Sequence, residues 1–349
     1  MHLVSRTAQV QTFFCDLPAF RFRQIEEALF DVKKRSFSDV STLPLVVRQK
    51  LDEKISWLVV HPAHILESVK KDTFKAIVKL SDDKRVETVL MRNARGQWTV
   101  CVSAQVGCAM ACTFCATGKM GFSRNLTSDE IVDQYRLWRI FLHDHPEREG
   151  RISNIVFMGM GEPLANYDNV KEALRQILTY TDIGPTHITV STVGLLPMLR
   201  TILEDQTWPP VRLAVSLHSA DSETRKAMMP SSFDGFLDEL AEWTNAYFLV
   251  FDSRRRHLTF EYVMLADIND TKEHAEKLIR FARRVGKARI NLIPYNFTGS
   301  VYRDSSARQF DRFEEMLRSA GVNVTRRRTM GDDIAAACGQ LIVVKKNSL

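Results

Sequence analysis

The chain has 349 residues, of which 45% are hydrophobic and 26% charged, a composition that excludes disordered and low-complexity proteins. No apolar stretch reaches the ~18 residues of a membrane span, and the first residues lack the pattern of a secretory signal, so we expect a cytoplasmic protein without membrane contact. The net charge of +6 comes from the ends: residues 1–86 carry 15 basic and 11 acidic side chains, and residues 301–349 carry 9 and 6. This excess suits a polyanion such as RNA, although it is also common as a solubility feature.

The chain is predicted to begin with short helices and two extended segments, followed by alternating strands and helices. Helical spacing covers residues 22–30 and 46–51, and residues 74–80 and 86–91 look extended. Further strands are expected at 99–102, 152–157, 188–190, 212–215, 258–263 and 288–293. Such alternation indicates an α/β protein with parallel strands that form a barrel or part of one, beside a small helical accessory domain.

Three units are therefore expected along the chain. Residues 1–86 would form an RNA-binding helical domain and linker, residues 87–300 the core barrel, and residues 301–349 a carboxyl-terminal extension. In such barrels the loops after the carboxyl ends of the strands carry the chemistry.

Cys108, Cys112 and Cys115 lie within eight residues, in the order Cys-x3-Cys-x2-Cys. Structural zinc sites use four protein ligands, commonly as two pairs, and the sequence has no second pair of cysteines. An iron–sulfur cluster held by three cysteines keeps one iron open for a substrate. The spacing favours such a cluster, while buried thiols or a zinc site completed by a distant histidine remain alternatives.

Polar residues follow several of the expected strands. Met158–Pro163 is a glycine-rich loop with Glu162 in it, and Ser191, Ser216–His218 and Asn296 come at other strand ends. Glycines such as Gly161 let a backbone approach a ligand closely, and these side chains can bond a nucleoside. Each is equally interpretable, taken alone, as a polar cap on a strand or a turn.

The spacing of the cysteines resembles that of radical S-adenosylmethionine (SAM) enzymes, and further motifs resemble the RlmN/Cfr family of adenosine methyltransferases within them. The resemblance covers nearly the whole chain. Its specific motifs are Cys101-Val-Ser-Ala-Gln-Val-Gly-Cys108, Cys115-Ala-Thr-Gly118, Gly121-Phe-Ser-Arg-Asn-Leu126, Met158-Gly-Met-Gly-Glu-Pro163 and Ala337-Cys338-Gly-Gln-Leu341. Ala335 departs from the family pattern, which commonly has Asp there.

The resemblance implies a partial (β/α)6-type barrel. It also implies two cofactors and assigns residues to them. Cys108, Cys112 and Cys115 would hold a [4Fe-4S] cluster. The SAM site would be lined by Gly161, Glu162, Ser191, Ser216, Leu217, His218 and Asn296.

The resemblance also implies three catalytic residues. Cys338 would accept a methyl group from one SAM, and the radical from a second SAM would activate that methyl for addition to an adenine carbon. Glu87 would accept a proton, and Cys101 would attack Cys338 to free the methylated base, leaving a transient disulfide. Glu87 has the weakest independent support, because an exposed strand glutamate is the usual interpretation of such a residue.

Family members methylate carbon 2 of an adenosine in large-subunit ribosomal RNA, some also in transfer RNA, or carbon 8, which confers antibiotic resistance. Gln105-Val-Gly107 and Ile293-Pro-Tyr-Asn296 favour carbon 2, and the segment 24–30 leans towards carbon 8. An electron donor such as flavodoxin and a monomeric state are expected. Candidate phosphate contacts are Lys119, Arg124, Arg254–Arg256 and Arg326–Arg328.

Two other classes of protein remain open. A radical SAM enzyme acting on a small substrate would give Cys101 and Cys338 no paired roles. A non-catalytic cluster protein that binds RNA or transfers electrons would need a fourth protein ligand.

Overall fold

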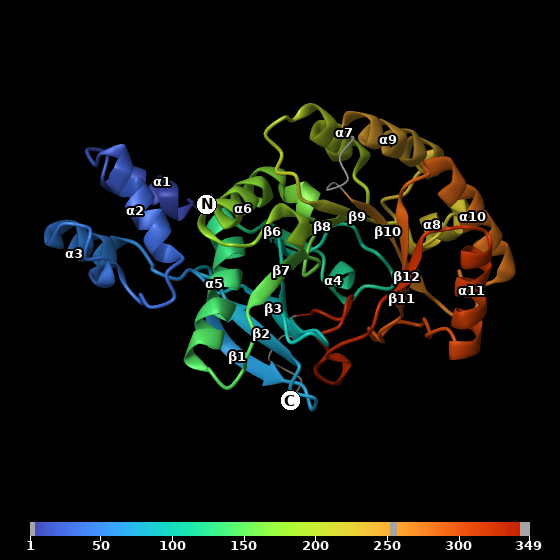
Figure 1. The fold of residues 1–349 in the computed structure, drawn as a ribbon, viewed down its shortest axis with the longest axis horizontal. Coiled ribbons are helices and arrows are strands. Elements are labelled where there is room, and N and C mark those ends of the chain that lie inside the picture. Colours follow the sequence, from blue (N-terminus) through green and yellow to red (C-terminus); the bar gives the residue numbers. More distant parts are fainter. Residues whose placement is uncertain (1–3, 252–256, 343–349) are drawn as a thin grey trace.

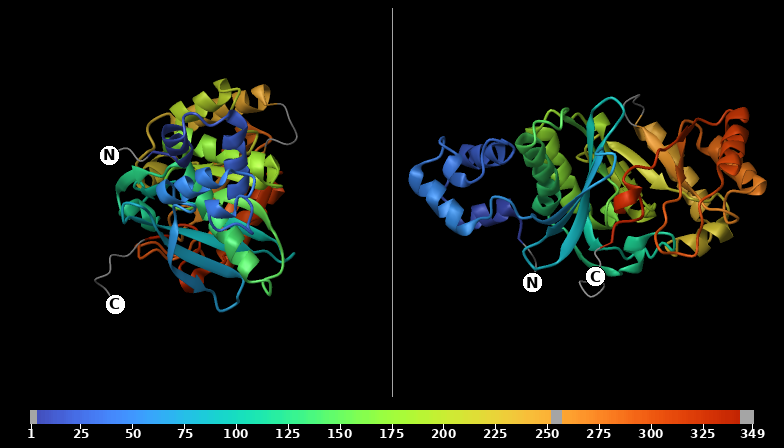
Figure 2. Two further views of the ribbon diagram at one scale, coloured as in Figure 1. Left: turned by 90° about the vertical axis from the view of Figure 1, so that its left-hand side faces the viewer. Right: turned by 90° about the horizontal axis from the view of Figure 1, so that it is seen from below.

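A ten-stranded sheet organises the computed structural model, which describes residues 4–251 and 257–342 (Figures 1 and 2). Its order is β1-β2-β3-β4-β7-β8-β9-β10-β11-β12, and from β4 onward neighbouring strands are parallel. The parallel strands are β4 (Trp98–Cys101), β7 (Ile152–Phe157), β8 (Ile188–Thr192), β9 (Arg212–Ser216), β10 (Leu258–Met264), β11 (Arg289–Pro294) and β12 (Val324–Arg326). The predicted α/β class with a partial barrel is confirmed, and the short strand β12 was not anticipated.

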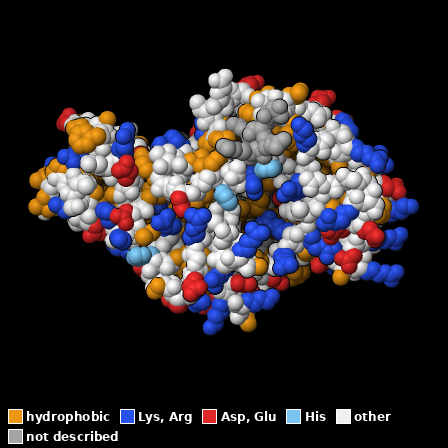
Figure 3. Space-filling model, in the orientation of Figure 1, with side chains coloured by type: hydrophobic (Ala, Val, Ile, Leu, Met, Phe, Trp, Pro, Cys, Tyr) orange, Lys and Arg blue, Asp and Glu red, His pale blue; other side chains and the backbone are white. Residues whose placement is uncertain are grey.

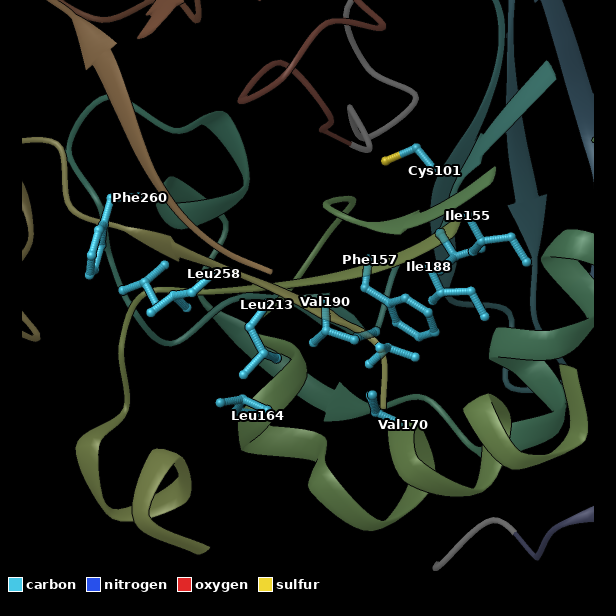
Figure 4. Close-up of a cluster of buried hydrophobic side chains, with 14 of the residues drawn as sticks. Cys101, Ile155, Phe157, Leu164, Val170, Ile188, Val190, Leu213, Leu258 and Phe260 are labelled. Atoms are coloured by element: carbon cyan, nitrogen blue, oxygen red, sulfur yellow. The ribbon is translucent and has the colours of Figure 1, made fainter. Parts of the chain in front are cut away.

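Helices cover the outer face of the parallel strands. They are α5 (Ser128–Asp144), α6 (Tyr167–Tyr180), α7 (Leu196–Glu204), α8 (Ser222–Met228), α9 (Phe236–Val250), α10 (Lys272–Val285) and α11 (Ala307–Ser319). The start of α5 follows from its sequence, because Thr127 and Glu130 form a reciprocal capping box. Figure 4 shows Phe157, Val190 and Leu213 from three strands beside Leu164 and Val170, with Cys101 lying apart from them.

Three antiparallel strands extend the sheet on one side. They are β1 (His61–Glu67), β2 (Thr73–Lys79) and β3 (Arg85–Arg92), and β3 pairs with β4 in an antiparallel register that sets Val89 opposite Cys101. We expected β2 and β3 but not β1, an exposed edge strand whose Pro62 and two histidines give no strand pattern. Part of the range 1–86 therefore belongs to the same sheet as the barrel.

The first helices form a separate lobe at the left of Figure 1, namely α1 (Arg6–Phe13), α2 (Ala19–Leu29), the 3₁₀ turn η1 (Phe37–Asp39) and α3 (Leu45–Lys54). A small core that includes Phe37 and Leu51 holds the lobe together. The lobe is joined to α5 by buried charges, since Arg6 pairs with Asp129 and Asp133, and Arg136 of α5 donates to the Leu29 carbonyl of the lobe. The helix α1 was not expected from the sequence.

Short elements lie at the mouth of the barrel. They are a two-stranded sheet of β5 (Gln105–Gly107) and β6 (Phe122–Asn125), the helix α4 (Ala116–Lys119), and the 3₁₀ turns η2 (Pro163–Asn166) and η4 (Asp332–Ile334). A further 3₁₀ turn, η3 (Pro185–His187), lies at the opposite end of the strands, directly before β8. Within the described residues, none of the helices has the length and apolar character needed to cross a bilayer.

Candidate functional site

A cavity of about 170 Å³ lies at the carboxyl ends of the parallel strands and gathers most of the predicted site residues. The loop between β5 and α4 brings the three clustered cysteines to its wall, and the strand ends bring the polar residues. The predicted residues that line it are Cys108, Cys112, Cys115, Gly161, Glu162, Ser191, Ser216, His218, Asn296 and Cys338. Leu217 is fully buried behind this wall and does not line the cavity.

The three clustered thiols have the donor chemistry that an iron–sulfur cluster needs. Burial raises the pKa of Cys108 to about 11 and raises the pKa of Cys112 and Cys115 as well, so positive charge must be supplied before they ionise. In the described parts of the chain, no group of three or more His, Cys, Asp or Glu side chains is arranged to hold a single metal ion. A cluster differs from a single ion in spreading its thiolate ligands over several iron atoms, and three thiols on one cavity wall fit that requirement.

Glu162 is held as a buried acceptor at the end of β7. Its two carboxylate oxygens accept from the backbone N–H groups of Leu164 (2.9 Å) and Val193 (2.7 Å), and its own N–H donates to Gln105 Oε1 (2.8 Å). Burial raises the pKa of Glu162 to about 7. Gly161 has a φ of 95°, and a Cβ there would lie 2.4 Å from Gln105 Cβ, which explains the need for glycine. Sequence reasoning missed the positioning role of Gln105.

His218 connects the cysteine loop to the end of β9. Its Nδ1 accepts from the backbone N–H of Val263 (3.0 Å), so the ring proton is on Nε2, and burial lowers its pKa to about 3. The ring packs edge-on against Phe114, with centroids 4.9 Å apart. The imidazole is therefore a neutral donor beside the cysteine loop.

A second, larger cavity of about 830 Å³ adjoins the first one. Both cavities are lined by Cys338, Asn296, Met158 and Arg327, whereas Cys101 lines only the second. Basic side chains at this second cavity are Lys70, Arg92, Arg327 and Arg328. Cys338 thus lies on the wall between two compartments, and Cys101 faces the larger of them.

A charged cluster lies where the cavities meet, and it contains Arg327, one of the predicted phosphate contacts, and Glu261, which the sequence analysis did not single out. Arg327 donates to Met158 Sδ (3.2 Å), and the Cys338 thiol beside it raises the pKa of this guanidinium, with Glu261 and Cys101 adding to the effect. Burial raises the pKa of Cys101 to about 12 and that of Glu261 also, and Glu261 accepts from Asn291 Nδ2 (2.8 Å). A lone glutamate within an apolar strand was the available signal for Glu261.

Glu87 lies outside both cavities, on β3. It is buried, not exposed as a strand glutamate usually is, and pairs with Lys75 (3.2 Å). Its carboxylate also accepts from the backbone N–H of Ile342 (3.0 Å), and Lys75 donates to the Ala335 carbonyl (3.0 Å). This pair therefore holds the segment that carries Cys338.

The same segment is bonded to the cysteine loop. Ala116 N–H donates to the Gly339 carbonyl (2.8 Å), and Thr117 Oγ1 donates to the Leu341 carbonyl (2.6 Å). Asn296 Nδ2 donates to the Cys338 carbonyl (3.2 Å). Ala335 has a φ of 50°, a left-handed conformation that costs an alanine energy. All six cysteines are free thiols in the structure.

The predicted phosphate contacts have different surroundings. Arg124 is bound by Asp82 and Glu130, and Arg326 by Asp311 and Glu314, so their charges are already paired. Lys119 donates to the Gly299 carbonyl (3.1 Å), and Arg328 is exposed at the second cavity. Arg254–Arg256 lie outside the described residues. Lys and Arg side chains border the hollow near the middle of the face shown in Figure 3.

Comparisons with known proteins agree with this geometry. Residues 102–282 match the model of the radical SAM superfamily. The chain is 41% identical over 332 residues to the dual-specificity RNA methyltransferase RlmN of Desulfotalea psychrophila, covering 93% of this chain and 89% of the relative. It is 38% identical over 328 residues to a probable RlmN of Dictyoglomus turgidum, covering 93% and 90%. A crystal structure of a radical SAM methyltransferase from Sphaerobacter thermophilus is similar with a TM-score of 0.87 and 33% identity, over 97% of each chain.

Proposed function

The chain belongs to the radical SAM superfamily and, within it, to the RlmN family of RNA methyltransferases, and from this we propose that it methylates carbon 2 of an adenosine in ribosomal RNA and in transfer RNA. The observation that carries the proposal is that Cys338 lines both cavities while Cys101 lines the second. A carbon-8 specificity is not favoured, because the relatives are named RlmN.

The first cavity is proposed as the cofactor site. Cys108, Cys112 and Cys115 would hold a four-iron cluster, and SAM would lie against Gly161, Glu162, Ser191, Ser216, His218 and Asn296, with Leu217 packed behind them. When bound, these two groups supply the methyl carbon and the radical reactivity that an electron-poor adenine ring carbon requires. The carboxylate of Glu162 would bind the amino group of SAM, and the Nε2–H of His218 would donate a hydrogen bond to an acceptor atom of SAM.

Cys338 is proposed as the methyl carrier. A thiol on the wall between the compartments can take a methyl group on the cofactor side and present it to a base on the other side. Because one side chain reaches both cavities, the methyl group would cross between them without either substrate leaving its own compartment. Arg327 also lines both cavities, so a fixed positive charge lies at the wall that carries Cys338.

Cys101 is proposed to release the product. When the base is bonded through a methylene carbon to Cys338, Cys101 would lose its thiol proton and attack the Cys338 sulfur to form a disulfide. The electron pair of the broken carbon–sulfur bond would stay with the carbon, which takes up a proton and becomes the methyl group of the base. Glu87 is proposed as the proton acceptor. Burial raises the pKa of Glu87, which makes it a stronger base, and one hydrogen bond separates it from the segment that carries Cys338.

The second cavity and the amino-terminal lobe are proposed to bind the RNA. Lys70, Arg92 and Arg328 give the larger cavity the positive rim that a polyanion requires. We also propose the helical lobe as an RNA contact within the organisation of residues 1–86, 87–300 and 301–349, in which both end ranges contribute strands to the sheet of the barrel. A monomer that acts in the cytoplasm and receives electrons from flavodoxin or a similar donor completes the proposal.

The test is mass spectrometry of adenosines from ribosomal and transfer RNA after anaerobic reaction with the reconstituted protein, SAM and a reductant. We expect 2-methyladenosine with the wild type and none with Cys338→Ala. A Cys101→Ala variant should instead accumulate RNA bonded to the protein. If 8-methyladenosine formed, the site on the base would be wrong, and cleavage of SAM without any gain of mass on RNA would overturn the substrate.

A further inference from the structure

Arg225 is a fully buried arginine on α8, behind the wall of the first cavity. Its Nε donates to the Leu217 carbonyl (3.1 Å), and its Nη2 donates to the carbonyls of Val193 (2.9 Å) and Ser216 (3.1 Å). The guanidinium carbon lies 3.8 Å from the centre of the Phe236 ring. Arg225 thus fixes the ends of β8 and β9, where the proposed SAM-site residues lie.

The contacts of Arg225 leave its charge uncompensated by any carboxylate in residues 4–251 and 257–342. Its acceptors are neutral carbonyls, and its buried Nη1 has no hydrogen-bond partner in this part of the chain. Burial lowers the pKa of Arg225 to about 9. In contrast, the buried Arg136 pairs directly with Asp133. A buried cation without an anion is costly, so the complete site is expected to supply one.

The cysteine loop adjoins the end of α8 and can supply this negative charge. Thr113 donates through its N–H (3.0 Å) and its hydroxyl (3.2 Å) to the carbonyl of Met228, the last residue of α8. Cys112 packs in one apolar cluster with Met228 and Met229, and it is the thiol that interacts electrostatically with Arg225. Three thiolates around a four-iron cluster give a net negative charge that increases when the cluster accepts an electron.

We propose that Arg225 is the buried counter-cation of the iron–sulfur cluster, and that it stabilises the reduced cluster more than the oxidised one. The inference rests on the proposed function, because it requires the cluster at Cys108, Cys112 and Cys115. It extends that function by assigning a positioning residue that sets the reduction potential. The backbone of Val193 connects both parts of the site, since its N–H donates to Glu162 and its carbonyl accepts from Arg225.

The test compares reconstituted wild type, Arg225→Gln and Arg225→Lys in the absence of RNA. Iron content is measured first, and the midpoint potential of the cluster is then determined by a redox titration monitored by electron paramagnetic resonance. Arg225→Gln removes the charge, and we expect the ratio of reduced to oxidised cluster at a given potential to fall about tenfold. This corresponds to a midpoint potential that is more negative by ~59 mV for one electron. Arg225→Lys keeps the charge and should recover most of this shift. The matched control is Phe236→Leu, which removes the ring under the guanidinium, keeps the charge and should leave the potential unchanged.

An unchanged potential and iron content in Arg225→Gln would overturn the inference while leaving the proposed function intact. A wild type that binds no iron on reconstitution would instead defeat the proposed function, and with it this inference. If Arg225→Gln does not fold, the inference is tested by comparing amide hydrogen exchange of the wild-type protein before and after reconstitution of the cluster. Reconstitution should slow exchange in residues 193–194 and 216–228, and equal exchange in the apo and reconstituted proteins would contradict a counter-cation.

Discussion

The two cavities share Cys338 but differ in size and in charge. The first encloses about 170 Å³ and is lined by three clustered cysteines and two buried glutamates, Glu162 and Glu261. The second encloses about 830 Å³ and has Lys70, Arg92 and Arg328 at its wall. A small, mostly apolar compartment with a few buried polar groups suits a compact cofactor, and a large basic one suits a nucleotide with its phosphates. The difference teaches that one side chain can serve two ligands whose binding requirements are incompatible.

The largest expected effect is at the shared residue. Cys338→Ala should abolish RNA methylation and leave the affinities for SAM and RNA within about twofold, because it removes one sulfur and no charged contact. Radiolabelled methyl transfer measures the loss, and calorimetry and filter binding measure the two affinities. If Cys338→Ala lost affinity for SAM or RNA together with activity, Cys338 would contribute to ligand binding, and its role as a methyl carrier between the two cavities would be contradicted.

A change confined to the first cavity should affect SAM alone. Glu162→Gln removes the carboxylate, and we expect about tenfold weaker SAM binding, of the order of one charge-assisted hydrogen bond, with unchanged RNA affinity. The pKa of Glu162 is about 7, so the carboxylate ionises above this pH and protonates below it. SAM affinity of the wild type should therefore fall as the pH decreases from 8 to 6, by at most about tenfold per unit.

Calorimetric titration at several pH values checks this expectation. In Glu162→Gln the dependence between pH 6 and 8 should disappear. A wild-type affinity that stays constant over this range would show that Glu162 does not bind the ammonium group.

A change confined to the second cavity should affect RNA alone. Replacing both Lys70 and Arg328 with Gln should weaken RNA binding about five- to tenfold and reduce the salt dependence by about two phosphate contacts. SAM affinity should not change. Arg283→Gln, an exposed arginine on α10, is the matched control and should leave both affinities unchanged. Equal weakening by the control would mean that only net charge attracts the RNA.

The smallest expected effect lies in the segment between the cavities. Ala335 has a φ of 50°, and glycine adopts this conformation without strain, so Ala335→Gly should stabilise the fold by up to about 1 kcal/mol. Chemical denaturation of the apo protein measures the difference. A decrease in stability would show that the alanine methyl contributes packing that outweighs its backbone strain.

The sequence predicted the residues whose chemistry is local. The spacing of Cys108, Cys112 and Cys115, and a glutamate after a strand and two glycines, were sufficient to place those residues at one site. The sequence could not show which of three consecutive arginines lies between the two cavities. Strand β12 decides this, because it directs Arg326 towards Glu314 and Arg327 towards the cavities. The burial of Glu87 and Arg225 depends likewise on segments distant in sequence, the carboxyl-terminal segment and the ends of β8 and β9.

The buried ion pairs between the lobe and α5 have a consequence for modularity. Asp133 binds both Arg6 and Arg136, and it also accepts a hydrogen bond from the backbone N–H of Val59. The interface between the lobe and α5 therefore contains buried charges that depend on both parts. Deleting the lobe would remove Arg6 from Asp129 and Asp133 and would expose to water the face of α5 that the lobe covers. The helical lobe is thus not an independent domain that can be removed or exchanged without affecting the rest of the chain. A shorter protein expressed without it should be less soluble and less stable than the full chain, and calorimetry of the full chain should show one cooperative transition.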